Sequence, residues 1–99
     1  MRWLILASML AAFPAWGERC RAVDGQTLLC GRERVLIEGL HAPDLKAAGG
    51  EAARSRLQWR IRTGEVIIRR GGQDKFGRTL GRLYVNGNRI TQADVHRGR

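Results

Sequence analysis

Two short segments of the chain carry side chains that could do chemistry. His41 and Asp44 flank an Ala-Pro pair, and Arg78 ends the segment Asp74-Lys75-Phe76-Gly77-Arg78. A carboxylate such as that of Asp44 can orient or deprotonate water, and a guanidinium such as that of Arg78 can hold a phosphate. The imidazole of His41 is a poor ligand for Ca²⁺ and a good one for transition metals. These residue types point to phosphate chemistry or metal binding.

Each of these residues also has a plainer structural interpretation. Asp44 could cap a following helix, Arg78 could be a solvated strand residue, and His41 could be a surface histidine. Asp24, in the pair Asp24-Gly25, is typical of a turn. Gly77 is expected to supply a special backbone conformation. The secondary structure that positions these side chains therefore determines whether the functional or the structural interpretation applies.

The first 17 residues have the features of a secretory signal peptide. Arg2 supplies a positive start, residues 4–15 are apolar, and Ala15 and Gly17 are small residues at the two positions that a signal peptidase reads. The alternative is a membrane anchor, but the run is shorter than the ~20 residues a spanning helix needs, and Pro14 interrupts it. We expect cleavage after Gly17, a mature domain of residues 18–99 without a stable membrane span, and a secreted or periplasmic location.

The chain is strongly basic. Its 99 residues, enough for one domain, carry a formal net charge of +9, and 16 of the 18 basic residues are arginine. The expected mature chain keeps 17 basic and 9 acidic residues, a net charge of about +8. Such a charge favours nucleic acid, phosphates or an anionic membrane surface as partners. A compositional bias towards arginine combined with a solubilising surface is the alternative explanation.

Residues 19–31 are predicted to form a β-hairpin that contains both cysteines, Cys20 and Cys30. An even number of cysteines after a signal peptide predicts one disulfide, which should stabilise the fold by about 2–3 kcal/mol. A two-residue loop would set Cys20 opposite Leu29. A three-residue loop, residues 24–26, pairs residue 23 with 27 and residue 20 with 30, so the disulfide favours the longer loop with a bulge.

The remaining pattern predicts three more strands and one helix. The strands are expected at residues 34–40, 64–70 and 78–85, with a loop at residues 71–74 and a turn at Asn86-Gly87. A helix over residues 51–63 has an apolar stripe of Ala53, Leu57 and Ile61, and Gly64 is expected to end it. Trp59 is placed in the core beside this stripe rather than on the surface as a base-stacking platform. Thr91-x-x-Asp94 resembles a helix start.

Five short strands with a helix between the third and the fourth predict a mainly β, α+β domain. The arrangement favours a five-stranded Greek-key barrel of the OB type.

Three segments together resemble the staphylococcal nuclease (thermonuclease) family. Residues 23–28, Val-Asp-Gly-Gln-Thr-Leu, are similar to its Val-Asp-Gly-Asp-Thr-Leu segment, and residues 34–44 are similar to its Val-Arg-Leu-x-Gly-Ile-Asp-Ala-Pro-Glu segment. Residues 74–80, Asp-Lys-Phe-Gly-Arg-Thr-Leu, are similar to its Asp-Lys/Arg-Tyr-Gly-Arg-x-Leu segment. The resemblance covers roughly residues 20–98. It implies an SNase-like OB-fold domain, short at its C-terminus, of a divergent exported bacterial member.

In that family a Ca²⁺ ion, two arginines and a glutamate cleave phosphodiester bonds. The resemblance assigns Asp44 to the catalytic glutamate, Arg78 to the second catalytic arginine and Asp24 to an outer aspartate near the metal. It also assigns three substitutions: Gln26 and His41 at the two metal-ligand aspartates, and Leu36 at the first catalytic arginine. Ca²⁺ prefers carboxylate oxygens, and Leu36 cannot stabilise a phosphate's charge.

The resemblance implies a thermonuclease-like hydrolase whose Ca²⁺-dependent activity is weak or lost. The alternative is a non-catalytic module of OB type that binds nucleic acid or phosphate. A third and less favoured hypothesis is a decaying gene product. The expected partner is DNA or RNA, bound without sequence preference through its phosphates, and the protein is expected to be a monomer.

Overall fold

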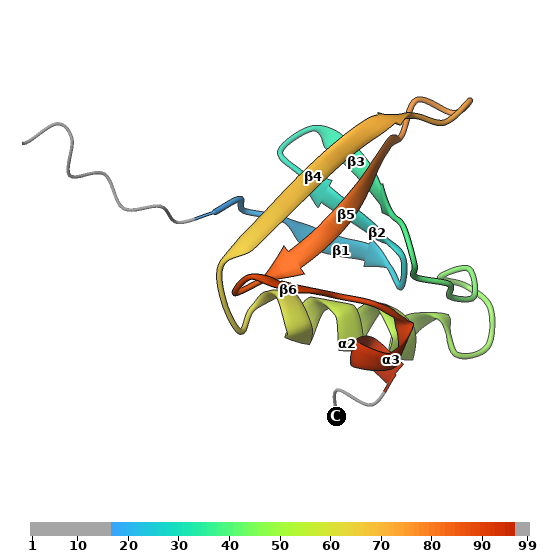
Figure 1. The fold of residues 1–99 in the computed structure, drawn as a ribbon. Coiled ribbons are helices and arrows are strands. Elements are labelled where there is room, and N and C mark those ends of the chain that lie inside the picture. Colours follow the sequence, from blue (N-terminus) through green and yellow to red (C-terminus); the bar gives the residue numbers. More distant parts are fainter. Residues whose placement is uncertain (1–16, 97–99) are drawn as a thin grey trace, which may run out of the picture.

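The computed structural model describes residues 17–96, so residues 1–16 of the predicted signal peptide lie outside the described range. Within this range the chain forms six strands and two helices (Figure 1). The elements are, in order, β1 (Arg21–Asp24), β2 (Thr27–Cys30), β3 (Glu33–Ile37), α2 (Gly50–Ile61), β4 (Val66–Gln73), β5 (Thr79–Val85), β6 (Asn88–Arg89) and α3 (Gln92–His96).

The strands form one mixed sheet in the order β1-β2-β3-β5-β4, with β6 on β5. The β3–β5 pair is parallel and the other strand pairs are antiparallel. Glu18, just before β1, donates its N–H to the carbonyl of Val66 in β4 at 2.8 Å, which brings the two edges of the sheet together. Helix α2 joins β3 to β4 and lies across one end of the sheet (Figure 1). The architecture confirms the predicted mainly β, α+β class and is consistent with an OB-like fold.

The hydrophobic core lies between the inner face of the sheet and α2. In β3, Val35 and Ile37 are buried while Leu36 is only partly covered, which is the alternation expected of a strand with one buried face. The predicted stripe of α2 is also confirmed, since Ala53, Leu57 and Ile61 are its buried apolar residues.

The first hairpin confirms the disulfide but corrects the loop. Cys20 and Cys30 are joined, with their Cα atoms 4.2 Å apart. However, Asp24 pairs with Thr27, so only two residues form the turn. A bulge between Ala22 and Asp24 then shifts the strand pairing by one residue, which sets Arg21 opposite Leu29. The extra residue predicted in the loop is thus found in the strand, because a bulge shifts register as effectively as a longer loop.

Gly25 in this turn packs under the helix. A Cβ atom at this position would lie 2.5 Å from the Cβ of Ala42 and 2.6 Å from the Cβ of Ala53. Those distances are shorter than van der Waals contact allows, so the turn requires glycine for the close approach.

Several element boundaries differ from the prediction. Strand β4 extends through the expected loop to Gln73, with a bulge between Arg70 and Gln73. Helix α2 ends at Ile61 with Arg62 as its C-cap, so Gly64 does not end it. A Cβ at Gly64 would instead collide with the side chain of Asn86, and this glycine serves a close approach.

Trp59 is not a core residue. Its exposed fraction is 47%. It lies two positions after buried Leu57, about 200° further round the helix at 100° per residue, and therefore faces solvent. The predicted helix start at Thr91 is confirmed, because Asp94 accepts hydrogen bonds from both the N–H and the hydroxyl of Thr91.

Candidate functional site

The three substituted positions of the resemblance meet in one place. Gln26 from the β1–β2 turn, Leu36 from β3 and His41 from the following loop line a cavity of about 220 Å³. Leu40 and Leu80 complete much of its wall. Leu36 and Leu80 are register neighbours on the parallel strands β3 and β5, so their side chains lie side by side. We call this cavity, defined by Gln26, Leu36, Leu40, His41 and Leu80, the leucine pocket.

The donor set of the leucine pocket does not fit Ca²⁺. Gln26 offers one amide and His41 one imidazole, whereas Ca²⁺ takes six to eight oxygen ligands. The one carboxylate on the wall, Glu38, is engaged by Arg82 at 3.4 Å and by Arg89 at 4.0 Å. Among residues 17–96 the only cluster of three potential metal ligands is Glu18, Cys20 and Cys30, whose two sulfur atoms form the disulfide.

Arg78 lies in a second cavity on the same face of the sheet. Val23, Asp24, Thr27, Arg34 and Arg78 line it, and its volume is about 120 Å³. We call it the arginine pocket. Two arginines therefore line one small cavity, and one of them, Arg34, was not predicted. The signal was present in the sequence, because Arg34 and Leu36 alternate with buried Val35 and so share the outer face of β3.

The β4–β5 turn fixes Arg78. Asp74 accepts the backbone N–H of Arg78 at 2.9 Å and its Nε at 2.7 Å. Desolvation raises the pKa of the Asp74 carboxyl, but the hydrogen bonds from Arg78 and the N–H of Phe76 outweigh it and hold that pKa below its usual value. The guanidinium of Arg78 also lies 5.6 Å from the ring centroid of Phe76. Gly77 has a φ of 83°, which confirms its expected backbone role.

The two aspartates of the resemblance behave differently. Asp24 accepts the N–H of Gln26 at 2.9 Å, which confirms its turn-forming role, and it also lines the arginine pocket. Asp44 is exposed in the loop before α2 and is not among the lining residues of either pocket. Its carbonyl accepts the N–H of Ala47, and the N-cap of α2 is Gly49, so the Asp44 side chain does not cap this helix.

Many arginines are already paired. Arg54 contacts Glu51 at 2.6 Å, and Arg70 contacts Glu18 at 2.6 Å and Glu33 at 2.8 Å. Hydrogen bonds from Arg70 and Thr79 lower the pKa of the Glu33 carboxyl. The arginine side chains that have no hydrogen-bond or ion-pair partner within residues 17–96 are those of Arg19, Arg21, Arg32, Arg34, Arg56, Arg62 and Arg69.

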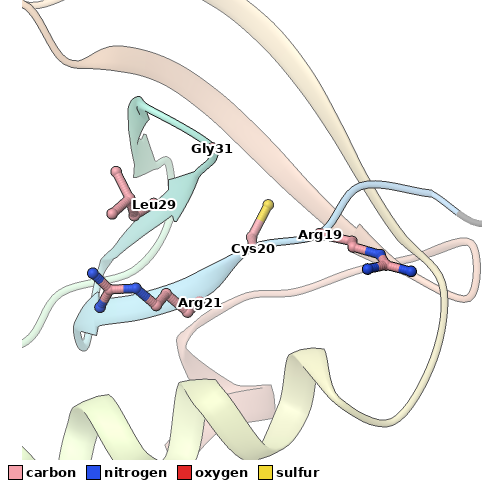
Figure 2. Close-up of a pocket in the computed structure, with 5 residues that line it drawn as sticks. All are labelled: Arg19, Cys20, Arg21, Leu29 and Gly31. Carbon is pink, nitrogen blue, oxygen red and sulfur yellow. The ribbon is translucent and has the colours of Figure 1, made fainter.

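Two of these arginines flank the disulfide. Arg19 and Arg21 lie on either side of Cys20, and with Leu29 and Gly31 they line a shallow, open depression (Figure 2). In the sheet, Arg21 pairs with Leu29, and Leu29 pairs with Arg34 on its other side. The outer face of β1, β2 and β3 thus carries a cross-strand row of two arginines separated by one leucine.

These features define a small α+β protein of OB-like architecture with a basic sheet face. The chain is 36% identical over 85 residues to a micrococcal nuclease of Shigella flexneri, covering 78% of this chain and 49% of that protein. It is 36% identical over 89 residues to Protein ParB of Escherichia coli, covering 82% of this chain and 50% of that protein. The chain spans about half the length of these curated relatives. No protein-family model matches it. The similarity supports a nuclease-like relationship.

Proposed function

We propose that this chain is a divergent thermonuclease-family protein that binds the phosphates of nucleic acids and hydrolyses them weakly or not at all. The observation that carries this proposal is the leucine pocket. The similarity to a micrococcal nuclease supports the relationship. The pocket holds an amide, an imidazole and leucines where the sequence resemblance implies carboxylates and a guanidinium.

The physical argument is electrostatic. Phosphodiester cleavage concentrates negative charge on phosphate oxygens, and prearranged cations are needed to stabilise it. Removing one such donor costs about 3–4 kcal/mol of transition-state stabilisation, or roughly 100- to 1,000-fold in rate. Leu36 supplies no such donor, and Gln26 and His41 do not form a Ca²⁺ site. If hydrolysis is absent altogether, the protein is a non-catalytic binding module.

Arg21 and Arg34 on the outer sheet face support binding to nucleic acid, because their side chains have no partner among residues 17–96. Phosphate contacts release counterions, so affinity for a single strand should fall with salt with a slope of about −0.7 for each contact. Three contacts predict roughly a 20-fold loss of affinity for a fourfold rise in salt. Among the described residues no helix is long and apolar enough to cross a membrane. We also propose export with cleavage after Gly17, and a monomeric state.

Two measurements test the proposal on purified protein. Fluorescence anisotropy with labelled DNA and RNA should show binding at low salt that weakens at moderate salt. A parallel nuclease assay with Ca²⁺ or with chelator should show little chelator-sensitive cleavage. Robust chelator-sensitive cleavage would overturn the assignment of lost activity, and absence of binding at low salt would overturn the binding role.

A further inference from the structure

The arginine pocket supplies the kind of group that the leucine pocket lacks. Arg34 and Leu36 lie two residues apart on β3, so their side chains leave the sheet on the same face. Leu36 lines the leucine pocket, whereas Arg34 lines the arginine pocket together with Arg78. The arginine pocket therefore takes Arg34 from a position two residues before Leu36, which the resemblance assigns to the first catalytic arginine.

Both guanidinium groups have donors to offer. The Arg34 side chain is exposed and has no hydrogen-bond partner within residues 17–96. Arg78 holds Asp74 through its Nε, and its two terminal nitrogens have no hydrogen-bond partner in the same range. Asp74 thus orients Arg78 while leaving the end of the guanidinium available, and arginine suits a phosphate because its donors are arranged as a fork.

A buried hydroxyl adds a second, independent indication of a ligand. Thr27 lines the same pocket and is 4% exposed, and its Oγ has no hydrogen-bond partner among the described residues. Buried polar groups are nearly always paired, so an unpaired hydroxyl beside two cations favours a ligand that brings an acceptor. Because this oxygen is covered, a ligand reaches it only after the side chains around it shift.

The negative charge of Asp24 would repel an anion bound in this pocket. Its carboxylate lines the cavity, where it accepts the N–H of Gln26. The two arginines outnumber it, but its charge must reduce the attraction for a phosphate. Asparagine can form the same turn without the charge, so this residue offers a variant that should strengthen binding.

We infer that the arginine pocket holds one phosphate of a nucleic-acid strand between Arg34 and Arg78, and that Arg21 contacts a neighbouring phosphate. Arg21 lies two strands from Arg34 in the cross-strand row, roughly 10 Å away at the usual strand spacing. The strand then follows the outer face of β1, β2 and β3 towards the depression beside the disulfide (Figure 2). This inference rests on the proposed nucleic-acid binding and assigns its site.

The test compares two arginines that differ mainly in position. Arg34→Gln and Arg32→Gln each remove one exposed arginine with no side-chain partner within residues 17–96, but Arg32 lies in the turn before β3, outside the pocket. Affinity for a short labelled single-stranded DNA is measured by anisotropy at low salt. Arg34→Gln should weaken binding about tenfold, as expected for a charged hydrogen bond, and Arg32→Gln no more than about threefold.

Two further variants probe the pocket without removing a cation. Thr27→Val should weaken binding about threefold at unchanged melting temperature, because the hydroxyl has no partner to lose. Asp24→Asn should tighten binding about threefold. Equal losses for Arg34→Gln and Arg32→Gln, or no gain for Asp24→Asn, would overturn the inference while the proposed binding stands. If the wild-type protein fails to bind at low salt, the proposed function fails with it.

Discussion

The leucine pocket and the arginine pocket lie on the same sheet face and share strands, yet their chemistry differs. Both take residues from the β1–β2 hairpin and from β3, and β5 or the turn before it completes each. One has three leucines in its wall, and its single carboxylate, Glu38, is paired with Arg82 and Arg89. The other is lined by Arg34 and Arg78, whose terminal guanidinium nitrogens have no hydrogen-bond partner within residues 17–96. Under the proposed function, this face would keep its affinity for anions although the adjoining pocket lacks the groups needed to cleave them.

The largest expected effect comes from restoring the leucine pocket. The triple variant Gln26→Asp, Leu36→Arg, His41→Asp returns two carboxylates and one guanidinium, so hydrolysis with Ca²⁺ should rise at least about 100-fold over wild type. Initial rates on DNA with Ca²⁺ and with chelator measure it, and Gln26→Asp alone is the control. A folded triple variant with neither Ca²⁺ binding nor activity would place the defect at Asp44 or elsewhere.

An intermediate effect is expected from opening the hairpin that both pockets use. Cys20→Ser with Cys30→Ser removes the disulfide and should lower stability by about 2–3 kcal/mol. For a domain of this size that corresponds to a fall in melting temperature of roughly 10–20 °C. Calorimetry of the double variant beside wild type measures the shift. A mass spectrum of exported wild type should show no free thiols and a chain beginning at Glu18.

The smallest effect concerns the link between β3 and β5. Hydrogen bonds from Arg70 and Thr79 lower the pKa of Glu33, so its contribution to stability is present above the ordinary pKa of about 4.5 and is lost as pH falls through the lowered value. The Glu33 and Arg70 side chains are 34% and 38% exposed, so solvent screens their ion pair and a modest effect is expected.

Thermal melts of Glu33→Gln between neutral and acidic pH should therefore show less acid destabilisation than wild type. Glu65→Gln is the control, because the Glu65 carboxylate has no hydrogen-bond partner within residues 17–96. If the melting temperatures of both variants follow the same pH dependence as wild type, Glu33 does not contribute to the loss of stability at acidic pH.

Sequence patterns predicted the parts of the fold that depend on periodicity and covalent bonding. The stripe of α2, the alternation in β3 and the Cys20–Cys30 pair are of this kind. The location of the hairpin bulge was missed, because loop and strand insertions produce the same cysteine register. Trp59 was misplaced because apolar character was given more weight than its angle on the helix.

For the site, the sequence predicted which positions meet but not which ones are free to bind. Gln26, Leu36 and His41 do line one cavity. The net charge of the sequence does not show which arginines are available to a phosphate, and Arg54 and Arg70 are held by carboxylates. The Arg54–Glu51 pair is a local i,i+3 pair on α2, whereas the Arg70 pairs join residues up to 52 positions apart and depend on the sheet topology, which periodicity does not reveal.

The packing of Gly25 against Ala42 and Ala53 bears on how this lineage can change over evolutionary time. Any side chain at Gly25 would push the hairpin away from the helix, so purifying selection for folding alone is expected to keep glycine there whether or not the protein cleaves anything. Leu36, by contrast, lies on the outer sheet face and is only partly buried. The Asp-Gly pair at this turn is therefore explained by packing alone, and its presence is no evidence of catalytic activity.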